Sequence, residues 1–354
     1  MAKRSVIDAV SFSGNRVIWL DQTKLPFKES YISSESVERL CTAIKRLEIR
    51  GAPLIGIAAA FGIAAAAANS RAKDGAMLLN ELKSVSKKLN STRPTAVNLS
   101  NALLRMMDAA EKLSGKPKKE MVEGIIREAK SVKLEEERAS YSMGRYGNSV
   151  VKKNHVIMTH CNTGSLATAG IGTALGVIRT AHKSGKKVRV LACETRPLLQ
   201  GARLTTWELK RDGISVTLIT DGAAAYAMRN CKVDMVIVGA DRILMDGSAA
   251  NKIGTYSLAI LAKEHGIPFY IAAPVSTIDG HTKARHFLGK IEQRNPKEVL
   301  RFGNMRIAPE VKALNPAFDI TPGNMISGII TENGIARAPY KKSLAKLLKK
   351  VNKR

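Results

Sequence analysis

Short apolar segments alternate with longer amphipathic segments along the second half of the chain. The apolar segments are short and rich in residues typical of strands, and they lie at 156–158, 188–193, 214–219, 235–240 and 268–273. The segments between them read as helices and lie at 174–182, 201–210, 223–229 and 256–265. Continuous apolar strands separated by helices predict a parallel sheet covered on both faces.

Polar clusters follow the apolar segments at their carboxyl ends. The clusters are HCNTGS from His160, ETRP from Glu194, TDGA from Thr220, GADRI from Gly239 and APVST from Ala273. Ligands of open α/β sheets bind at that edge, near a switch in strand order. We therefore expect an α/β protein with a Rossmann-like parallel sheet and a functional site at the carboxyl edge of the sheet.

The first 130 residues have a different pattern. Residues 17–20 predict a strand, and residues 36–47 predict a helix capped by Ser36. The Ala-rich run at 55–68 is too short to span a membrane, so we interpret it as a buried helix. A basic segment at 116–130 leads to a long helix around 134–146. We expect a smaller, mixed but mainly helical N-terminal domain at 1–130 and a Rossmann-like catalytic domain at 131–354 that ends in a basic tail.

The formal net charge of +27 suggests either binding to nucleic acid or an anionic surface, or simply a lysine-rich soluble enzyme. The second interpretation is favoured, because the charge is dispersed, aromatic residues make up only 5%, and no nucleic-acid-binding motif is present. The last 14 residues lack acids, and their apolar residues have helical spacing, so this tail could dock on its own domain or on an acidic partner. We expect no membrane association.

Four widely spaced cysteines contain no CxxC pair: Cys41, Cys161, Cys193 and Cys231. This pattern is not typical of a zinc site or of a disulfide framework. A reducing, cytoplasmic location fits it best.

Cys161 and Asp241 are the two candidates for chemistry. A lone cysteine at a strand end is usually an inert apolar residue, but NTGS and a helix follow Cys161. Backbone N–H groups near the thiol could bind an anion or lower the pKa of the thiol. Asp241 directly follows the apolar segment at 235–240, so its carboxylate should project at the same edge of the sheet. It could equally cap a helix or bind a ribose.

Arginine, amide and lysine side chains are candidate anchors for a phosphate or a polyol. Arg50 precedes Gly51, whose bare backbone permits a ligand to approach closely, and Arg93 precedes a proline. Surface arginines are usually solvated, so both readings of these two residues stay open. Asn251 and Lys252 are expected to open the helix that follows GADRI.

The chain contains seven motifs between residues 50 and 322: RGAPLIG, STRPTAVNL, THCNTGSLAT, ETRPLLQGARLTTWEL, GADRI with ANKIGTY, IPFYIAAPVSTID and NPAFDITP. Together they resemble the methylthioribose-1-phosphate isomerase family. They are also similar to its relatives, the regulatory subunits of the translation-initiation guanine-nucleotide exchange factor and the archaeal ribose-1,5-bisphosphate isomerases. The cysteine of HCN with the aspartate of GADRI is typical of the isomerase branch.

This resemblance implies that Asp241 is the proton donor and that Cys161 assists at the transition state. It implies no metal or nucleotide cofactor, and we expect a homodimer. It further implies substrate contacts from Arg50, Gly51, Ala52, Arg93, Gln200, Asn251 and Lys252.

The implied reaction is the aldose–ketose isomerisation of 5-methylthioribose 1-phosphate to 5-methylthioribulose 1-phosphate in methionine salvage. Because phosphate caps C1, the sugar ring cannot open spontaneously, and an acid must protonate the ring oxygen as it leaves. Asp241 would serve if a dry pocket raised the pKa of its carboxyl. Hydrogen then passes from C2 to C1, either through an enediolate or as a hydride. The alternatives are isomerisation of 5-deoxyribose 1-phosphate or ribose 1,5-bisphosphate, and a non-catalytic exchange-factor subunit.

Overall fold

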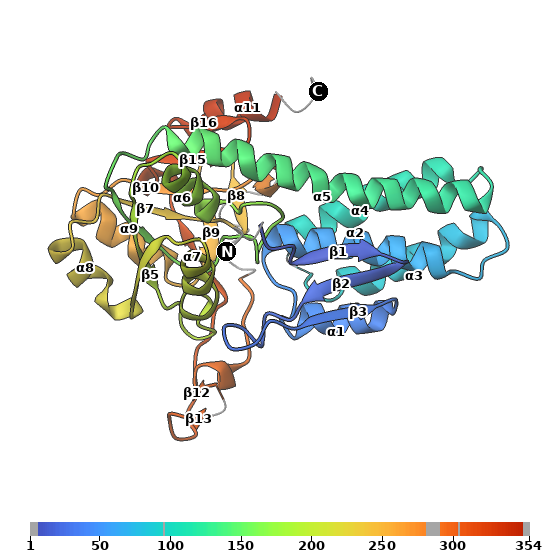
Figure 1. Cartoon of the computed structure of the whole chain (residues 1–354), viewed down its shortest axis with the longest axis horizontal. Helices are drawn as coiled ribbons and strands as arrows, with labels where there is room; N and C mark the ends of the chain where they lie inside the picture. Colours follow the sequence, from blue (N-terminus) through green and yellow to red (C-terminus); the bar gives the residue numbers. More distant parts are fainter. Residues whose placement is uncertain (1–5, 95, 281–290, 304, 350–354) are drawn as a thin grey trace. The chain divides into compact units, whose positions relative to one another are not determined.

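The computed structural model describes residues 6–94, 96–280, 291–303 and 305–349 (Figure 1). The chain folds as two compact units, Met1–Ser140 with Ser165–Gly172 and Tyr141–Gly164 with Thr173–Arg354. The division falls within helix α5 (Lys118–Asn148), after Ser140 rather than after residue 130, where the sequence predicts a domain boundary. Residues 116–130 and 134–146, expected as a basic segment and a separate helix, belong almost entirely to this one helix.

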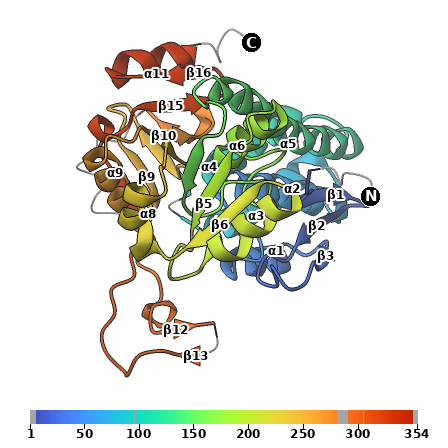
Figure 2. The ribbon, with the colours of Figure 1, turned by 60° about the vertical axis from the view of Figure 1, so that its left-hand side comes forward.

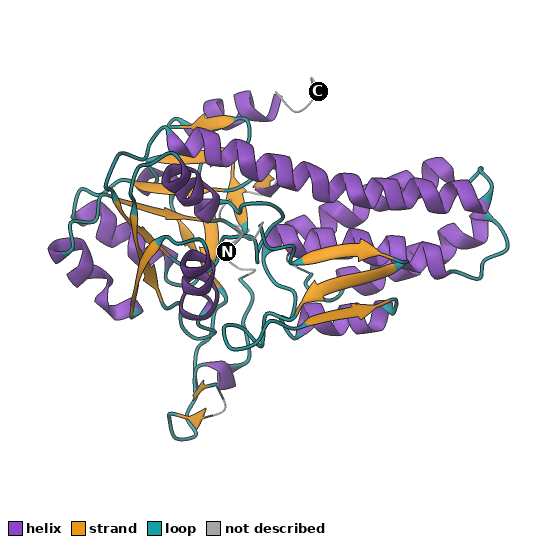
Figure 3. Cartoon of the chain, viewed as in Figure 1, coloured by secondary structure: helices purple, strands orange, loops and turns teal. Residues whose placement is uncertain are grey.

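The first unit combines a small antiparallel sheet with helices (Figure 3). Ser36 caps α1, because its hydroxyl accepts a hydrogen bond from the Arg39 N–H at 3.2 Å. The predicted strand at 17–20 and the predicted serine-capped helix are confirmed. The elements are β1 (Val10–Ser13), β2 (Arg16–Leu20), β3 (Tyr31–Ser34), α1 (Val37–Lys45), α2 (Ala52–Asn69), α3 (Gly75–Asn90) and α4 (Val97–Leu113).

Helix α2 is apolar on all sides. Its length and hydropathy would allow it to cross a membrane, but 78% of it is buried inside the structure. A helix without a polar face is stable in water only when neighbouring elements surround it. Contacts with α1, α3 and α4 provide that cover, so α2 is the buried helix that the Ala-rich run predicts.

The second unit contains a seven-stranded sheet with the order β16–β15–β10–β7–β4–β5–β6 (Figure 2). All neighbouring strands are parallel except β15 and β16. Its strands are β4 (Val156–Thr159), β5 (Arg189–Cys193), β6 (Ser215–Ile219), β7 (Met235–Val238), β10 (Phe269–Ala272), β15 (Gly328–Thr331) and β16 (Gly334–Ala336). The five predicted strands and the parallel sheet are confirmed.

Helices follow the strands of this sheet at the predicted places. They are α6 (Ala174–Lys183), a π-helical turn (Gly201–Thr205) that continues into α7 (Thr206–Arg211), a 3₁₀ turn (Asp221–Ala223) before α8 (Ala224–Asn230), and α9 (Thr255–Glu264). Further 3₁₀ turns occupy Val275–Thr277, Pro296–Glu298 and Gly323–Met325.

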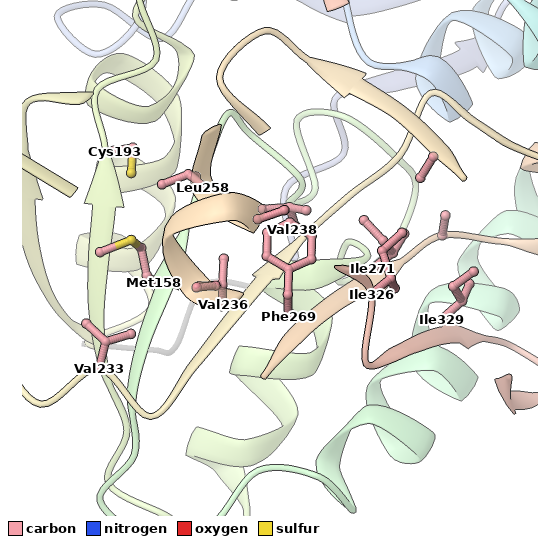
Figure 4. Packing of buried hydrophobic residues seen from close by; sticks show 14 of the residues in the cluster. Met158, Cys193, Val233, Val236, Val238, Leu258, Phe269, Ile271, Ile326 and Ile329 are labelled. Atoms are coloured by element: carbon pink, nitrogen blue, oxygen red, sulfur yellow. The ribbon is translucent and has the colours of Figure 1, made fainter. Parts of the chain in front are cut away.

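One face of the sheet forms the core shown in Figure 4. Side chains two residues apart on each strand point to this face, as with Met158 on β4, Val236 and Val238 on β7 and Phe269 on β10. Helices α8 and α9 cover them. The alternate residues of the same strands are buried as well, so both faces are covered, as the continuous apolar runs predict.

The basic tail packs on this core. Helix α11 (Tyr340–Lys349) buries Leu344 and Leu347 in the same cluster. Of the two possibilities open from sequence, the structure therefore shows docking on the tail's own unit. Val351, the last apolar residue of the predicted pattern, lies outside the described residues.

A second, four-stranded sheet has the order β11–β8–β9–β14. Its strands are β8 (Arg242–Leu244), β9 (Ala249–Lys252), β11 (Ile278–Asp279) and β14 (Phe318–Thr321). The prediction that Asn251 and Lys252 open a helix is wrong, because both residues end β9, and α9 begins at Thr255. The pairing partner that makes this segment a strand, β14, lies far away in sequence.

Residues 291–303 and 305–317 of the second unit form an arm that carries the hairpin of β12 (Arg301–Phe302) and β13 (Met305–Arg306) (Figure 2). Several large apolar side chains of the arm are exposed: Phe302, Met305, Ile307, Val311 and Leu314.

Candidate active site

Cys161 and Asp241 follow two neighbouring parallel strands. Cys161 comes after β4 and Asp241 comes after β7, and these strands pair with Met158 opposite Val236. The chain passes from β4 to β5 and β6 on one side, then returns to β7 on the other side of β4, so the strand order switches between them. Such switch points are where open α/β sheets bind ligands.

The two loops that carry these residues are in contact. A Cβ atom placed on Gly239, two residues before Asp241, would lie 2.8 Å from Cγ2 of Thr163, two residues after Cys161. Glycine is therefore needed for the loops to lie this close. The structure thus brings the predicted thiol and the predicted acid to one edge of the sheet.

Two threonine hydroxyls hold the backbone of Cys161. Its N–H donates to Oγ1 of Thr195 at 2.8 Å, and its carbonyl oxygen accepts from Oγ1 of Thr205 at 2.6 Å. Cys161 is 8% exposed, and its φ of 62° lies in the left-handed region. Both threonines belong to the motif ETRPLLQGARLTTWEL, but the sequence pattern gave no reason to single them out.

Asp241, Asn251 and Lys252 lie on adjoining backbone. The Asp241 N–H donates to the Ala250 carbonyl at 2.9 Å, which joins the β7–β8 connection to β9. Asn251 is buried and donates from Nδ2 to Thr255 Oγ1 at 3.0 Å. The Lys252 ammonium donates to the Ala317 carbonyl at 2.9 Å and lies 4.6 Å from the centre of the Phe318 ring.

Asp319 supports this segment and was not identified from the sequence. It lies on β14 opposite Asn251, and its carboxylate accepts hydrogen bonds from the N–H groups of Gly254 at 2.7 Å and Tyr256 at 3.1 Å. Burial raises the pKa of Asp319 to about 6, although these N–H groups and Lys252 act to lower it. The motif NPAFDITP contains this residue, but only the pairing of β9 with β14 shows what it holds.

Gln200 begins the helical segment after ETRP. It precedes the π-helical turn, and its side chain is buried. Its Oε1 makes no hydrogen bond within the described residues. A buried acceptor without a donor is costly, so a donor group of a ligand, such as a sugar hydroxyl, would stabilise it.

The other four predicted residues belong to the first unit. Gly51 has a φ of 98° and precedes α2, and a Cβ placed on it would lie 2.5 Å from Cα of Ala167. The close approach that this glycine permits in the structure is thus to protein backbone, and Leu54 adds a hydrogen bond from its N–H to the Ala167 carbonyl at 3.1 Å. Ala52 is the first residue of α2. Arg50 and Arg93 are half-buried, and Arg93 lies between α3 and α4.

Three side chains in the second unit, two of them buried, have donor atoms that are numerous and close enough to hold a metal ion. The donor atoms of His160, Cys193 and Asp221 lie within 4.8 Å of one another. However, both Asp221 oxygens already accept backbone N–H groups, from Thr195 at 2.9 Å and from Arg196 at 2.7 Å.

The thiol and the imidazole of this group have shifted pKa values. Burial raises the pKa of the Cys193 thiol to about 12, which favours the protonated form that binds metals poorly. Burial also lowers the pKa of His160, whose Nε2 lies 2.8 Å from the Ile253 carbonyl and donates to it. The protonated thiol and the carboxylate oxygens already bonded to backbone therefore make this donor set a poor cation site, although the imidazole alone could serve as a ligand.

Comparison with known proteins gives one family. A family model described as the initiation factor 2 subunit family matches residues 48–338. The methylthioribose-1-phosphate isomerase of Heliobacterium modesticaldum is 51% identical over 339 residues, which cover 96% of this chain and 98% of the relative.

Two solved structures are similar over nearly the whole chain. The crystal structure of 5-methylthioribose 1-phosphate isomerase from Pyrococcus horikoshii has a TM-score of 0.90 and 45% identity, and the match covers 97% of this chain and 96% of the other. A translation initiation factor eIF-2B, subunit delta, from A. fulgidus has a TM-score of 0.86 and 45% identity, with coverage of 97% and 99%. Because the family model matches most of its length, this chain belongs to the initiation factor 2 subunit family.

Proposed function

We propose that this protein is an aldose–ketose isomerase that converts 5-methylthioribose 1-phosphate to 5-methylthioribulose 1-phosphate. The observation that carries this proposal is the position of Cys161 and Asp241, in contacting loops at the switch point between β4 and β7. The names of the isomerases to which the chain is similar support the choice of substrate. The site residues below are part of the same proposal.

In this mechanism, Asp241 is the acid that opens the sugar ring. Its proton passes to the ring oxygen as the bond from that oxygen to C1 breaks, while the phosphate stays on C1. The hydrogen on C2 then moves to C1, and the C2 hydroxyl becomes a carbonyl and gives its proton back to the Asp241 carboxylate. Atoms and charge balance over the cycle, as an isomerisation requires.

Cys161 lies where C1 and C2 react in this proposal. The small residues that follow it leave backbone N–H groups that could face the C2 oxygen, where negative charge develops as its proton leaves, and such preorganised donors stabilise that charge in the transition state. The remaining substrate contacts that we propose are Arg50, Gly51, Ala52, Arg93, Gln200, Asn251 and Lys252.

The rival functions differ in the substrate or in the absence of turnover. The similarity to an initiation-factor subunit, at the same identity as to the isomerase structure, favours a binding subunit as the second candidate. Incubation with methylthioribose 1-phosphate, 5-deoxyribose 1-phosphate and ribose 1,5-bisphosphate, followed by NMR for ketose formation, separates them. We expect ketose from the first substrate. Saturable binding without ketose from any of the three would favour the binding subunit.

We further propose a homodimer and a cytoplasmic location. The apolar side chains exposed on the arm, such as Phe302, Met305 and Leu314, form a surface that a second copy would cover. Met305→Asp should then convert the dimer to monomer in sedimentation velocity, and a wild-type monomer would contradict the proposal.

The free thiols of Cys161 and Cys193 suit a reducing compartment. Fractionation of the source cells would test the cytoplasmic location.

A further inference from the structure

The conformation of Cys161 needs support from its surroundings. Its φ of 62° is unfavourable for any residue with a Cβ, and such residues persist only where the surrounding structure holds them. The hydroxyls of Thr195 and Thr205 hold one backbone group each, the N–H and the carbonyl. The direction in which the thiol points therefore depends on these two hydroxyls.

Thr205 connects Cys161 to a second buried contact. While its hydroxyl donates to the Cys161 carbonyl, it also accepts from Nδ2 of Asn162 at 3.3 Å. The same amide donates to Oε1 of Glu208 at 2.7 Å. Gly164 passes so near this carboxylate that a Cβ there would collide with it. We call the loop after β4 that carries Cys161 the thiol loop. Three of its residues, Cys161, Asn162 and Gly164, therefore contact Thr205 or Glu208.

A buried ion pair fixes Glu208 in turn. Glu208 is fully buried, and its Oε2 accepts from Nη2 of Arg179 at 2.8 Å. Nε of Arg179 donates to Asp212 at 2.7 Å. Burial acts to lower the pKa of Arg179, but the two carboxylates outweigh it and raise that pKa. Because an unpaired buried charge is very costly, this pair holds the Glu208 carboxylate in one place.

The helical segment that supplies Thr205 and Glu208 begins at Gln200. Its first turn is π-helical, with the Thr206 N–H bonded to the Gly201 carbonyl, and π-helical turns occur often at functional sites. Gly201 packs against the Cys193 carbonyl so tightly that no side chain fits there. Gln200, a proposed substrate contact, therefore lies on the same helical segment as Thr205 and Glu208, which hold the thiol loop.

We propose that Thr205 and Glu208 are positioning residues, which hold Cys161 in its left-handed conformation and link it to Gln200 through one helical segment. The inference rests on the proposed role of Cys161 in the isomerase reaction. Neither residue needs to touch the substrate. Their effect is on the direction of the thiol.

The test compares Thr205→Val with Thr205→Ser and with Thr206→Val. Valine keeps the shape of threonine and removes the hydroxyl, whereas serine keeps the hydroxyl. Thr206 is a matched control, because it lies on the same segment and its hydroxyl donates to the Ala202 carbonyl of its own helix. For Thr205→Val we expect kcat to fall about tenfold or more, with KM changed less than about twofold. The other two variants should keep wild-type kcat.

A second readout does not depend on turnover. The rate of iodoacetamide alkylation at Cys161, followed by peptide mass spectrometry across pH, reports the surroundings of the thiol, and the exposed Cys231 is the internal reference. Thr205→Val should change the alkylation rate and the pH profile at Cys161 only. Should Thr205→Val match wild type in both readouts, or should Thr205→Ser lose as much as Thr205→Val, the proposal is wrong.

If Thr205→Val does not fold, Thr205→Ala compared with Thr205→Ser applies the same criteria. Failure of the proposed function is recognised separately, because wild type would then form no ketose, or Cys161→Ser would run at the wild-type rate. The alkylation profiles would still decide whether Thr205 positions the thiol.

Discussion

Replacing Gly51 by alanine should destabilise the first unit far more than the same change at Gly14. Both glycines have positive φ values, 98° at Gly51 and 55° at Gly14, so both substitutions strain the backbone. They differ in their surroundings. A Cβ on Gly14, in the turn between β1 and β2, meets no atom within 4 Å, whereas a Cβ on Gly51 lies 2.5 Å from Cα and 2.6 Å from the carbonyl oxygen of Ala167.

The expected magnitude follows from three contributions. A positive φ in a sparsely populated region costs a residue with a Cβ about 1–3 kcal/mol. Alanine also lowers the conformational entropy of the unfolded chain, which stabilises the folded state by about 0.4–1 kcal/mol. Overpacking against Ala167, whose backbone cannot move aside cheaply, adds about 1–3 kcal/mol at Gly51 only. The difference between the two variants should therefore be about 1–3 kcal/mol in the free energy of unfolding.

Tryptophan fluorescence during urea unfolding measures this difference. The chain has two tryptophans, Trp19 in the buried core of the first unit and Trp207 in α7 of the second. In a Trp207→Phe background, Trp19 alone reports on the first unit. Equal shifts of the urea midpoint for Gly51→Ala and Gly14→Ala would refute the reasoning, because packing on Ala167 would then contribute nothing.

Four further predictions concern the site and the tail. Asp241→Asn should fold normally but lose at least ~10²-fold in kcat, since an amide cannot donate the acid proton; a near wild-type rate in the NMR assay would remove Asp241 from the mechanism. Arg93→Ala should raise KM about 10- to 150-fold if Arg93 holds the phosphate; calorimetry with unphosphorylated methylthioribose is the control, and an equal loss of affinity for it would mean a role in the loop only. The pKa of Asp319, about 6 when folded against an ordinary value of 3.8, means that the folded state binds the proton more tightly, so this contribution to stability is lost as pH rises from 3.8 to 6. Asp319→Asn should flatten that slope in urea midpoints measured at pH 4.5 and 7, and an unchanged slope would contradict it. Leu344→Ala should cost about 2–5 kcal/mol, because the side chain is fully buried in the core; an unchanged melting temperature would show that α11 does not dock in solution.

The sequence alone predicts the parts of this structure that depend on local patterns. The runs that became β4, β5, β6, β7 and β10 are short, continuous and apolar, which is what a strand buried on both faces requires. Their parallel order puts every following polar cluster at one edge. The sequence alone therefore predicts Cys161 and Asp241 at a common edge of the sheet.

Features that depend on distant partners could not be predicted in this way. Asn251 and Lys252 look like the start of a helix until β14 pairs with them, because the choice between strand and helix is made by hydrogen bonds to residues far along the chain. Ser165–Gly172 belongs to the first unit although the residues on both sides of it belong to the second. It does so because it packs against residues distant in sequence, such as Gly51.

The support of the thiol is decided by tertiary structure alone. Neither a threonine hydroxyl nor a glutamate carboxylate carries a local signal of which polar group it will meet in the folded chain. Only when β4 and β5 pair does Thr195 meet the Cys161 N–H, and only when the segment after Gln200 packs there do Thr205 and Glu208 reach the thiol loop. The chemistry-bearing residues follow from the sequence, whereas their orientation follows from buried polar contacts that exist only in the folded chain.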